Sequence, residues 1–436
     1  MLRKKIYSLL LVITGALTWF NVHAIEIIID KGVEKPIPVA IVPFGWSQAS
    51  ALPPMDIAGV IANDLTRSGR FSTMDEKDMP QQPSDFSSVN FKDWRLLGME
   101  NLVVGNLHLN NKGEYDVEFR LIDVYKEKQI AGFRIPSSEL LLRRTAHEIS
   151  DIIYEKLIGI RGAFATRIVY VTVNKNKDGT RKFSLQISDA DGYNPQILLE
   201  SKEPLLSPSW SPDGKKLAYV SFEGKNSAIY IQDILTGARE RIASNPGINS
   251  APDWSPDGSR LALTLSKDGN PEIYVFHIAS KLLRRITSNA AIDTEPAWSN
   301  DGRTIAFTSD RGGSPQIYEV AAEGSGDAKR VSFVGRYNAG PVFSPDDKSI
   351  AVIHGEGGVY RIGLLNRANG QVSVLTDSRM DESPSFAPNG HMIIYTTTGA
   401  RGTALAAISV DGNVHQRLAL QDGEVREPSW GPFTGR

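Results

Sequence analysis

A seven-residue motif that returns every 43 to 45 residues constrains the fold of this chain more than any other feature. The first copy is Pro208-Ser-Trp-Ser-Pro-Asp-Gly214. Later copies begin at Pro252, Pro296, Pro341 and Pro384, and a shortened copy, Pro428-Ser-Trp-Gly-Pro432, lies close to the C-terminus. A period of this length, with several short strands in each unit, is typical of a β-propeller.

Each repeat unit contains enough strands for one propeller blade. The sequence Ser-Pro-Asp-Gly predicts a type I turn, because Pro presets φ at the second position and Gly accepts a positive φ at the fourth. In the first unit, apolar runs follow the turn at Leu217–Val220, Ile229–Ile231 and Arg241–Ile242. Together with the Pro-x-Trp stretch, they predict four strands in each blade, with the aromatic side chain packed against the neighbouring blade.

Two copies of the motif depart from the pattern. One has Asn300 where the others have Pro, and the next has Asp347 where the others have the turn Gly. Because Gly is the residue that allows the positive φ, we expect the turn at Asp347 to be altered.

The two ends of the repeat region complement each other. Residues 167–200 contain three strand-like runs without a Pro-x-Trp stretch before them, whereas Pro428–Trp430 supplies such a stretch without runs after it. We therefore predict that the C-terminal strand completes the first blade and closes a ring of six blades. Closure of this kind also pairs a strand edge that would otherwise be open.

The first 24 residues are predicted to be a secretory signal peptide. Basic residues at Arg3–Lys5 precede an apolar run from Ile6 to Phe20, and Val22 and Ala24 place small residues at the cleavage positions. The apolar run is short for a membrane-spanning helix, which needs about 20 residues. Since the chain has no cysteine, it has neither disulfides nor a lipid-modified cysteine.

Residues 25–160 lack the repeat and predict a small α/β domain. The expected elements are a buried strand at Val39–Val42, a helix at Asp56–Leu65, a strand at Tyr115–Val124, and a second helix that Ser137 or Ser138 caps and Gly159 ends. The predicted fold is therefore mainly β, with this domain followed by a six-bladed β-propeller over residues 161–436, and residues 161–166 as the hinge.

The sequence contains no recognisable catalytic motif. It has no Gly-x-Ser-x-Gly elbow, no His-Glu-x-x-His zinc helix and no Walker loop. The formal net charge of −2, without a basic stripe, argues against nucleic acid as a partner. We therefore predict a protein that is not an enzyme and that requires no cofactor.

Acidic residues gather where the loops enter the proline strands. The set consists of Glu203, Glu295 and Glu427, which directly precede Pro, and of the nearby Asp293, Asp381 and Glu382. If the proline strand is innermost, these carboxylates ring one mouth of the central channel, where they attract cations or basic peptide groups. The alternative is that they are solvated loop acids, which keep strands from pairing at their edges.

The predicted signal peptide, small domain and six-fold repeat together resemble the TolB family, the periplasmic components of the Tol–Pal system. The more specific similarities are in Ile25–Asp30, Pro38–Phe44, Asp293–Pro296, Asp381–Pro384 and Ala387–Gly390. The resemblance implies a scaffold in the periplasm that supports outer-membrane constriction during division. It also implies that the propeller mouth binds the lipoprotein Pal, that some colicins thread into the same channel, and that calcium can occupy it.

The resemblance also implies positions for the partner contacts. The Pal-facing set carried over from the family is Ile248, Asn249, Ala251, Thr294 and Glu295, although Ile248 is apolar where a polar contact is expected. The segment expected to bind TolA is Ile25, Glu26, Ile27, Ile28, Ile29 and Asp30. This segment favours a β-strand, so it could add a strand to the sheet of a partner protein. The alternative is that it packs on its own domain.

Two other functions remain open from the sequence. A propeller-type hydrolase, or its regulatory domain, would require a further domain with Ser, Asp and His, or a nucleophile that residues 25–160 do not display. A cell-wall glycan bound in the channel is the other alternative, with neutral glycans favoured over anionic ones by the acidic mouth.

Overall fold

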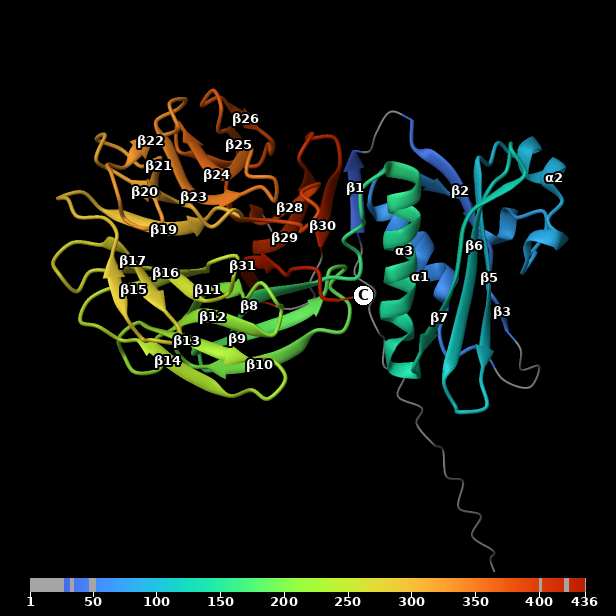
Figure 1. The fold of residues 1–436 in the computed structure, drawn as a ribbon, viewed down its shortest axis with the longest axis horizontal. Helices are drawn as coiled ribbons and strands as arrows, with labels where there is room; N and C mark the ends of the chain where they lie inside the picture. The colour runs from blue at the N-terminus through green and yellow to red at the C-terminus, as the bar shows by residue number, and fades with distance from the viewer. Residues whose placement is uncertain (1–26, 32–34, 47–51, 400–401, 419–422, 436) are drawn as a thin grey trace, which may run out of the picture.

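The computed structural model describes residues 27–31, 35–46, 52–399, 402–418 and 423–435, with side chains from residue 35 onward. A small α/β domain and a propeller lie side by side, with α3 and β1 between them (Figure 1). The predicted signal peptide, Ile25 and Glu26 lie outside the described residues. Within the described part, no helix is both long enough and apolar enough to cross a bilayer.

The N-terminal domain is a mixed sheet with helices on both faces. The sheet order is β4-β2-β5-β6-β7, with β3 also paired to β5, and β2 runs parallel to both β4 and β5. The strands are β2 (Ile37–Ile41), β3 (Gly45–Trp46), β4 (Phe71–Thr73), β5 (Asn101–Leu109), β6 (Tyr115–Asp123) and β7 (Lys128–Ser137). Helices α1 (Ile57–Arg67) and α3 (Leu142–Ile158) cover one face, and α2 (Phe91–Leu96) packs on the other through Trp94.

The helix ends largely follow the local sequence. The Asp56 carboxylate caps α1 by accepting from the Gly59 N–H at 2.8 Å, and Gly159 ends α3 with a φ of 88°. The prediction of a serine cap on α3 is wrong. Ser138 instead precedes a short 3₁₀ turn, Glu139–Leu141, and its side chain makes no capping hydrogen bond.

The propeller has six blades of four antiparallel strands each, as predicted. Blade one contains β8 (Arg167–Lys175), β9 (Arg181–Asp189), β10 (Gln196–Ser201) and β31 (Glu424–Trp430). Blades two and three contain β11 (Leu205–Trp210), β12 (Lys216–Ser221), β13 (Ala228–Asp233), β14 (Arg239–Ala243), β15 (Asn249–Trp254), β16 (Arg260–Leu265), β17 (Glu272–His277) and β18 (Leu283–Arg285). Blade four contains β19 (Asp293–Trp298), β20 (Thr304–Ser309), β21 (Gln316–Ala321) and β22 (Lys329–Arg330). Blades five and six contain β23 (Tyr337–Phe343), β24 (Ser349–Glu356), β25 (Val359–Asn366), β26 (Val372–Val374), β27 (Asp381–Phe386), β28 (Met392–Gly399), β29 (Gly402–Ser409) and β30 (His415–Leu418).

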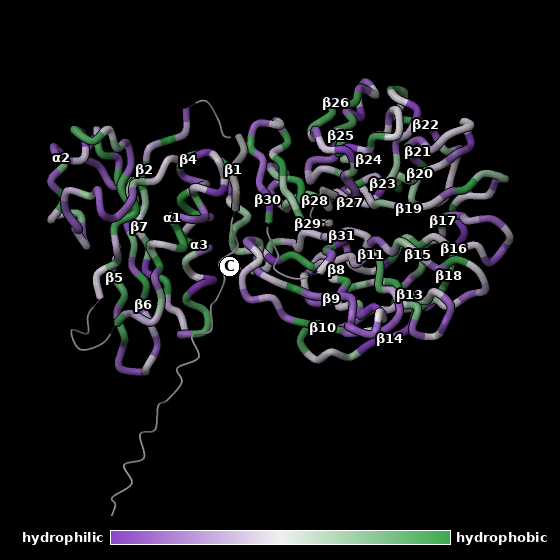
Figure 2. The backbone as a smooth tube through the Cα atoms, turned by 180° about the vertical axis from the view of Figure 1, so that it is seen from behind, coloured by the Kyte–Doolittle hydropathy of each residue, from purple (hydrophilic) through white to green (hydrophobic). Residues whose placement is uncertain are grey.

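The C-terminal strand closes the ring as predicted. β31 pairs antiparallel with β8, with Trp430 opposite Ile168 and Ser429 opposite Val169. Because β31 supplies the innermost strand of blade one, both ends of the propeller sequence meet within one sheet. Figure 2 shows hydrophilic and hydrophobic residues intermixed along the chain in both domains.

The repeated aromatic residue packs between adjacent blades. Trp254 of blade three, for example, lies in one buried cluster with Val220 and Ile229 of blade two. Equivalent clusters join the other five pairs of blades around the ring through Trp210, Trp298, Phe343, Phe386 and Trp430. The predicted role of this residue is confirmed.

The two departures from the motif form a single contact. Elsewhere the turn glycine faces a proline of the preceding blade, as Gly302 faces Pro256. In the departing pair, the Asp347 carboxylate accepts from the Asn300 N–H at 2.8 Å, from the Asn300 side-chain amide at 2.9 Å and from the Asp301 N–H at 3.0 Å. The expectation of an altered turn is wrong, since Asp347 adopts a φ of 57° and still closes the turn onto Ser344.

This contact leads to a prediction about stability. The single changes Asn300→Pro and Asp347→Gly should each destabilise the propeller, because each removes the hydrogen bonds between these two residues. The double change restores the Gly–Pro contact of the other blades and should recover most of the loss. We expect a coupling energy of about 1–3 kcal/mol from a double-mutant cycle measured by urea unfolding. Additive losses would contradict a direct interaction.

The N-terminal strand lies on the propeller. β1 (Ile27–Lys31) pairs antiparallel with β30, with Ile27 opposite Leu418 and Ile29 opposite Gln416, and it makes blade six a five-stranded sheet. One interpretation of the sequence was that this N-terminal segment packs on its own domain. In the described residues, its strand β1 pairs with β30 of blade six instead.

Candidate functional site

The central channel is a cavity of about 560 Å³ lined by the innermost strands of all six blades. Each of these strands has an irregular register before its proline, where the ladder is interrupted because proline has no N–H. The residue before the proline has a positive φ in every blade, between 47° and 59°: Ser207, Ala251, Glu295, Gly340, Ser383 and Glu427. Five of these six are not glycine, so five of the six blades hold a locally strained residue at the same position of the inner strand.

Three carboxylates of the channel each connect one blade to the next blade. Glu427 accepts a hydrogen bond from the Ser207 N–H, and Glu295 accepts from the Gly340 N–H at 2.9 Å. Asp253, one residue beyond its proline, accepts from the Trp298 N–H at 2.7 Å. Burial raises the pKa of Glu427 to about 7 and the pKa of Asp253 to about 6, although the hydrogen bonds to these carboxylates lower both pKa values.

Several acids predicted at the mouth lie elsewhere. Asp293 and Asp381 are fully buried, and so is the Asn249 side chain, so these three residues do not present polar groups to solvent as predicted. Glu203 is exposed and Glu382 is half-buried, and neither lines the channel. Only Glu295 and Glu427 of the predicted acids contribute to the channel wall.

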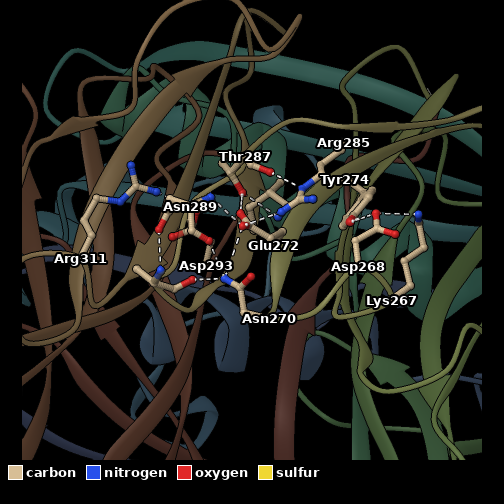
Figure 3. Close-up of polar contacts among 12 residues, drawn as sticks. Lys267, Asp268, Asn270, Glu272, Tyr274, Arg285, Thr287, Asn289, Asp293 and Arg311 are labelled. Carbon is tan, nitrogen blue, oxygen red and sulfur yellow. Dashed lines mark hydrogen bonds and ion pairs between the residues drawn. The ribbon is translucent and has the colours of Figure 1, made fainter.

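Asp293 belongs instead to a buried polar network beneath the mouth (Figure 3). It accepts from Arg311 at 2.7 Å and from Asn289 at 2.9 Å. Next to it, the fully buried Glu272 accepts from Thr287 at 2.6 Å and from Arg285 at 2.9 Å. The network fixes the loop that leads into β19.

Exposed apolar residues precede three of these buried groups along the chain. Ile248, Ile292 and Met380 are 45%, 49% and 44% exposed, and they immediately precede Asn249, Asp293 and Asp381 at the start of their inner strands. We call these three residues the apolar collar. Sequence reasoning included Ile248 but missed Ile292 and Met380, although the 44-residue step from Ile248 leads to Ile292.

The other positions that were predicted to face Pal lie close to the collar residues in the chain. Ala251 lines the channel, and Thr294 is half-buried beside the hydroxyl of Thr264 at 3.5 Å. The structure therefore brings Ile248, Ala251, Thr294 and Glu295 to the same end of the inner strands of blades three and four.

A second polar cluster lies between the two domains, and its geometry does not suit a metal ion. Ligand atoms of Asp64, His147 and Asp191 lie within 4.8 Å of one another. However, the imidazole directs its two nitrogens to different carboxylates, and Arg67 and Arg143 already pair with the same acids. Such an arrangement is a chain of ion pairs rather than a cage of ligands around one centre.

Comparisons with known proteins agree on one family. Residues 25–130 match the model of the TolB amino-terminal domain, and residues 154–434 match that of the TolB beta propeller domain. The chain is 56% identical over 411 residues to the Tol-Pal system protein TolB of Thioalkalivibrio sulfidiphilus, covering 94% of each chain. It is 52% identical to the protein of the same name from Nitrosococcus oceani, covering 99% of this chain and 100% of that one.

A solved structure supports the same conclusion. The crystal structure of TolB from Acinetobacter baumannii superposes with a TM-score of 0.86 at 39% identity, covering 94% of this chain and all of that one. The chain therefore belongs to the TolB family and is a non-catalytic protein of the Tol-Pal system.

Proposed function

We propose that this protein is a periplasmic scaffold that binds Pal at the apolar collar and channel mouth, and TolA through its mature N-terminus. Through these contacts it supports outer-membrane integrity and constriction during cell division. Family membership supports the assignment to the system, and the collar is the observation that carries the proposed Pal face. Exposed apolar residues around a concave opening, held by a buried polar network, are typical of a protein-binding surface.

The channel below the collar suits a segment of a partner that carries positive charge. Glu295, Glu427 and Asp253 face a cavity that is open to all six blades. A cationic group there would offset the cost of charging the buried carboxylates. This supports the threading of colicin segments into the channel and favours a protein ligand over a neutral glycan.

Calcium is compatible with the same carboxylates. Calcium prefers oxygen ligands and accepts several waters among them, and Glu295, Glu427 and Asp253 supply carboxylate oxygens on the channel wall. Bound calcium would hold these acids in their charged form and so prepare the channel for a partner. It is not required for the fold, because each of these acids has a hydrogen-bond donor of its own.

The placement of β1 supports the proposed role of the N-terminus. β1 is the edge strand of a five-stranded sheet. A strand of TolA can therefore pair with its open side, or it can take β1 away from β30. In either case the recognition uses main-chain hydrogen bonds, which suits a short tail rich in isoleucine.

Calorimetric titration with the periplasmic domain of Pal, with and without calcium, tests the proposed face. We expect one-to-one binding that weakens at least tenfold in Thr294→Arg and Glu295→Lys, because both place a bulky cation at the mouth. Glu240→Arg is the matched control, since Glu240 is an exposed acid on the outer strand β14. Absence of binding under both conditions, or equal loss in the control, would reject the proposed face.

A further inference from the structure

His147 lies at the centre of the polar cluster between the domains. It is on α3, and its Nδ1 is 2.7 Å from an oxygen of Asp64 on α1. Its Nε2 is 3.8 Å from an oxygen of Asp191, which belongs to the turn between β9 and β10 in blade one. The side chains of His147 and Asp64 are each only 2% exposed. The imidazole therefore connects a carboxylate of its own domain to a carboxylate of the propeller.

The two nitrogens of His147 both face acceptors. A neutral imidazole has a single N–H, so it can donate to only one of the two carboxylates, whereas the imidazolium can donate to both. The Nε2 atom is buried without a hydrogen-bond partner, and it is 3.8 Å from the oxygen of Asp191. The geometry around the ring thus matches the charged form.

Ion-paired groups of both domains surround His147. Asp64 pairs with Arg67 at 3.1 Å on α1. Arg143, one turn before His147 on α3, pairs with Asp191 at 2.5 Å and approaches Asp189 at 3.7 Å. Three carboxylates therefore face two guanidinium groups, and the imidazolium supplies the third positive charge.

One further acid lies near the cluster from α3. Asp151 is buried and accepts from the Phe164 N–H at 2.7 Å, and burial raises its pKa to about 7. Burial by itself would lower the pKa of His147, but Asp64 and Asp191 outweigh burial and raise that pKa above its usual value of 6.5. These two carboxylates therefore favour the charged form of His147.

We propose that the charged His147 locks the N-terminal domain onto blade one, and that this lock weakens as the pH rises. Because Asp64 of the same domain and, to a smaller extent, Asp191 across the interface raise the pKa of His147, its stabilising contribution is complete below about pH 6.5 and is lost as pH rises through the folded-state pKa. Deprotonation removes one positive charge from the buried cluster, and Asp191 then loses one of the two cationic groups that approach it from the other domain.

The domain interface around His147 also includes the sheet that holds the N-terminal strand β1. Gln416 of β30 donates from its side chain to the main-chain carbonyl of Arg67, the residue that pairs with Asp64. Gln416 is also the residue opposite Ile29 in β1. The His147 cluster and the sheet that holds β1 therefore belong to the same domain interface. Other contacts, such as Arg70 with Asp411 at 2.6 Å, tether the domains when the lock is open.

The first test measures the protonation of His147 in the full chain by NMR. We expect its titration midpoint to lie above pH 6.5, and Asp191→Asn to lower it by about one pH unit, a tenfold loss of proton affinity. His108, which lies on β5 and has no carboxylate among its hydrogen-bond or ion-pair partners in the described structure, is the internal reference and should not respond to Asp191→Asn. A midpoint at or below 6.5, or one that Asp191→Asn leaves unchanged, would overturn the proposal.

The second test measures the domain interface itself. Since the chain has no cysteine, spin labels can be placed at Lys112→Cys in the small domain and at the exposed Leu235→Cys in the propeller. We expect one narrow interdomain distance at pH 6 that broadens by pH 9, and a distance that is broad at both pH values in His147→Gln.

The matched control is His277→Gln, a histidine at the end of β17 within the propeller, which should behave like the unchanged protein. A distance that does not respond to pH, or a His147→Gln variant that keeps the pH response, would overturn the lock. If His147→Gln fails to fold, Asp191→Asn gives the same comparison from the propeller side.

Discussion

Removal of residues 424–436 is expected to abolish the cooperative unfolding of the propeller. This change deletes β31, so that blade one keeps three strands and β8 loses its partner at the channel. It also removes Trp430 and Val425 from the cluster that joins blade six to blade one. Loss of one large core aromatic costs about 3–5 kcal/mol, and the added loss of a strand brings the total close to the stability of a whole domain.

Urea unfolding followed by circular dichroism measures this effect. The truncated chain should unfold at a much lower urea concentration and with a smaller dependence on urea, because less surface is buried in its folded state. Removal of Gly435 and Arg436 alone is the control and should change stability by less than about 0.5 kcal/mol. A truncated chain that keeps the midpoint and slope of the full chain would show that the ring does not depend on its closing strand.

Trp254→Ala is expected to destabilise the propeller by about 3–5 kcal/mol. Trp254 is almost fully buried between blades two and three, and its Nε1–H donates to the Ser209 carbonyl of the preceding blade at 3.2 Å. Trp254→Phe keeps most of the apolar contact but leaves this carbonyl unpaired. We expect it to cost about 1–2 kcal/mol.

Trp298→Phe provides the matched comparison. Trp298 occupies the same position one blade later, but its Nε1 is buried without a hydrogen-bond partner. Blades five and six already carry a phenylalanine there, Phe343 and Phe386. Trp298→Phe should therefore cost less than Trp254→Phe in thermal or urea unfolding, and equal costs would show that the hydrogen bond at Trp254 contributes little.

The parts of the fold that were predictable are those encoded by neighbouring residues. The repeat specifies turns and strands through local φ preferences and apolar spacing, so the number of blades and the closing strand followed from the sequence. Gly159 ended α3 as expected for the same local reason. The serine cap failed because a short 3₁₀ turn, Glu139–Leu141, begins the helix instead, and the sequence does not distinguish the two.

The candidate site was predictable only in part. The acids before the prolines were found, but their side chains separate into channel-lining and buried groups. Glu295 lines the channel whereas Asp293, two residues earlier, is buried against Arg311. Side chains normally alternate between the two faces of a strand, but the bulge before each proline interrupts this alternation. Sequence position alone therefore does not predict which side chain faces the channel.

The sequence by itself determined the six-fold ring and its closure, because these depend on a pattern that each unit repeats within its own residues. Only the tertiary structure decided which distant residues meet. It placed β1 on β30, paired Asn300 with Asp347 across two blades, and set His147 of the small domain between Asp64 and Asp191. Contacts of this kind depend on how completed elements pack, and no local preference of the chain encodes the partner on the other side.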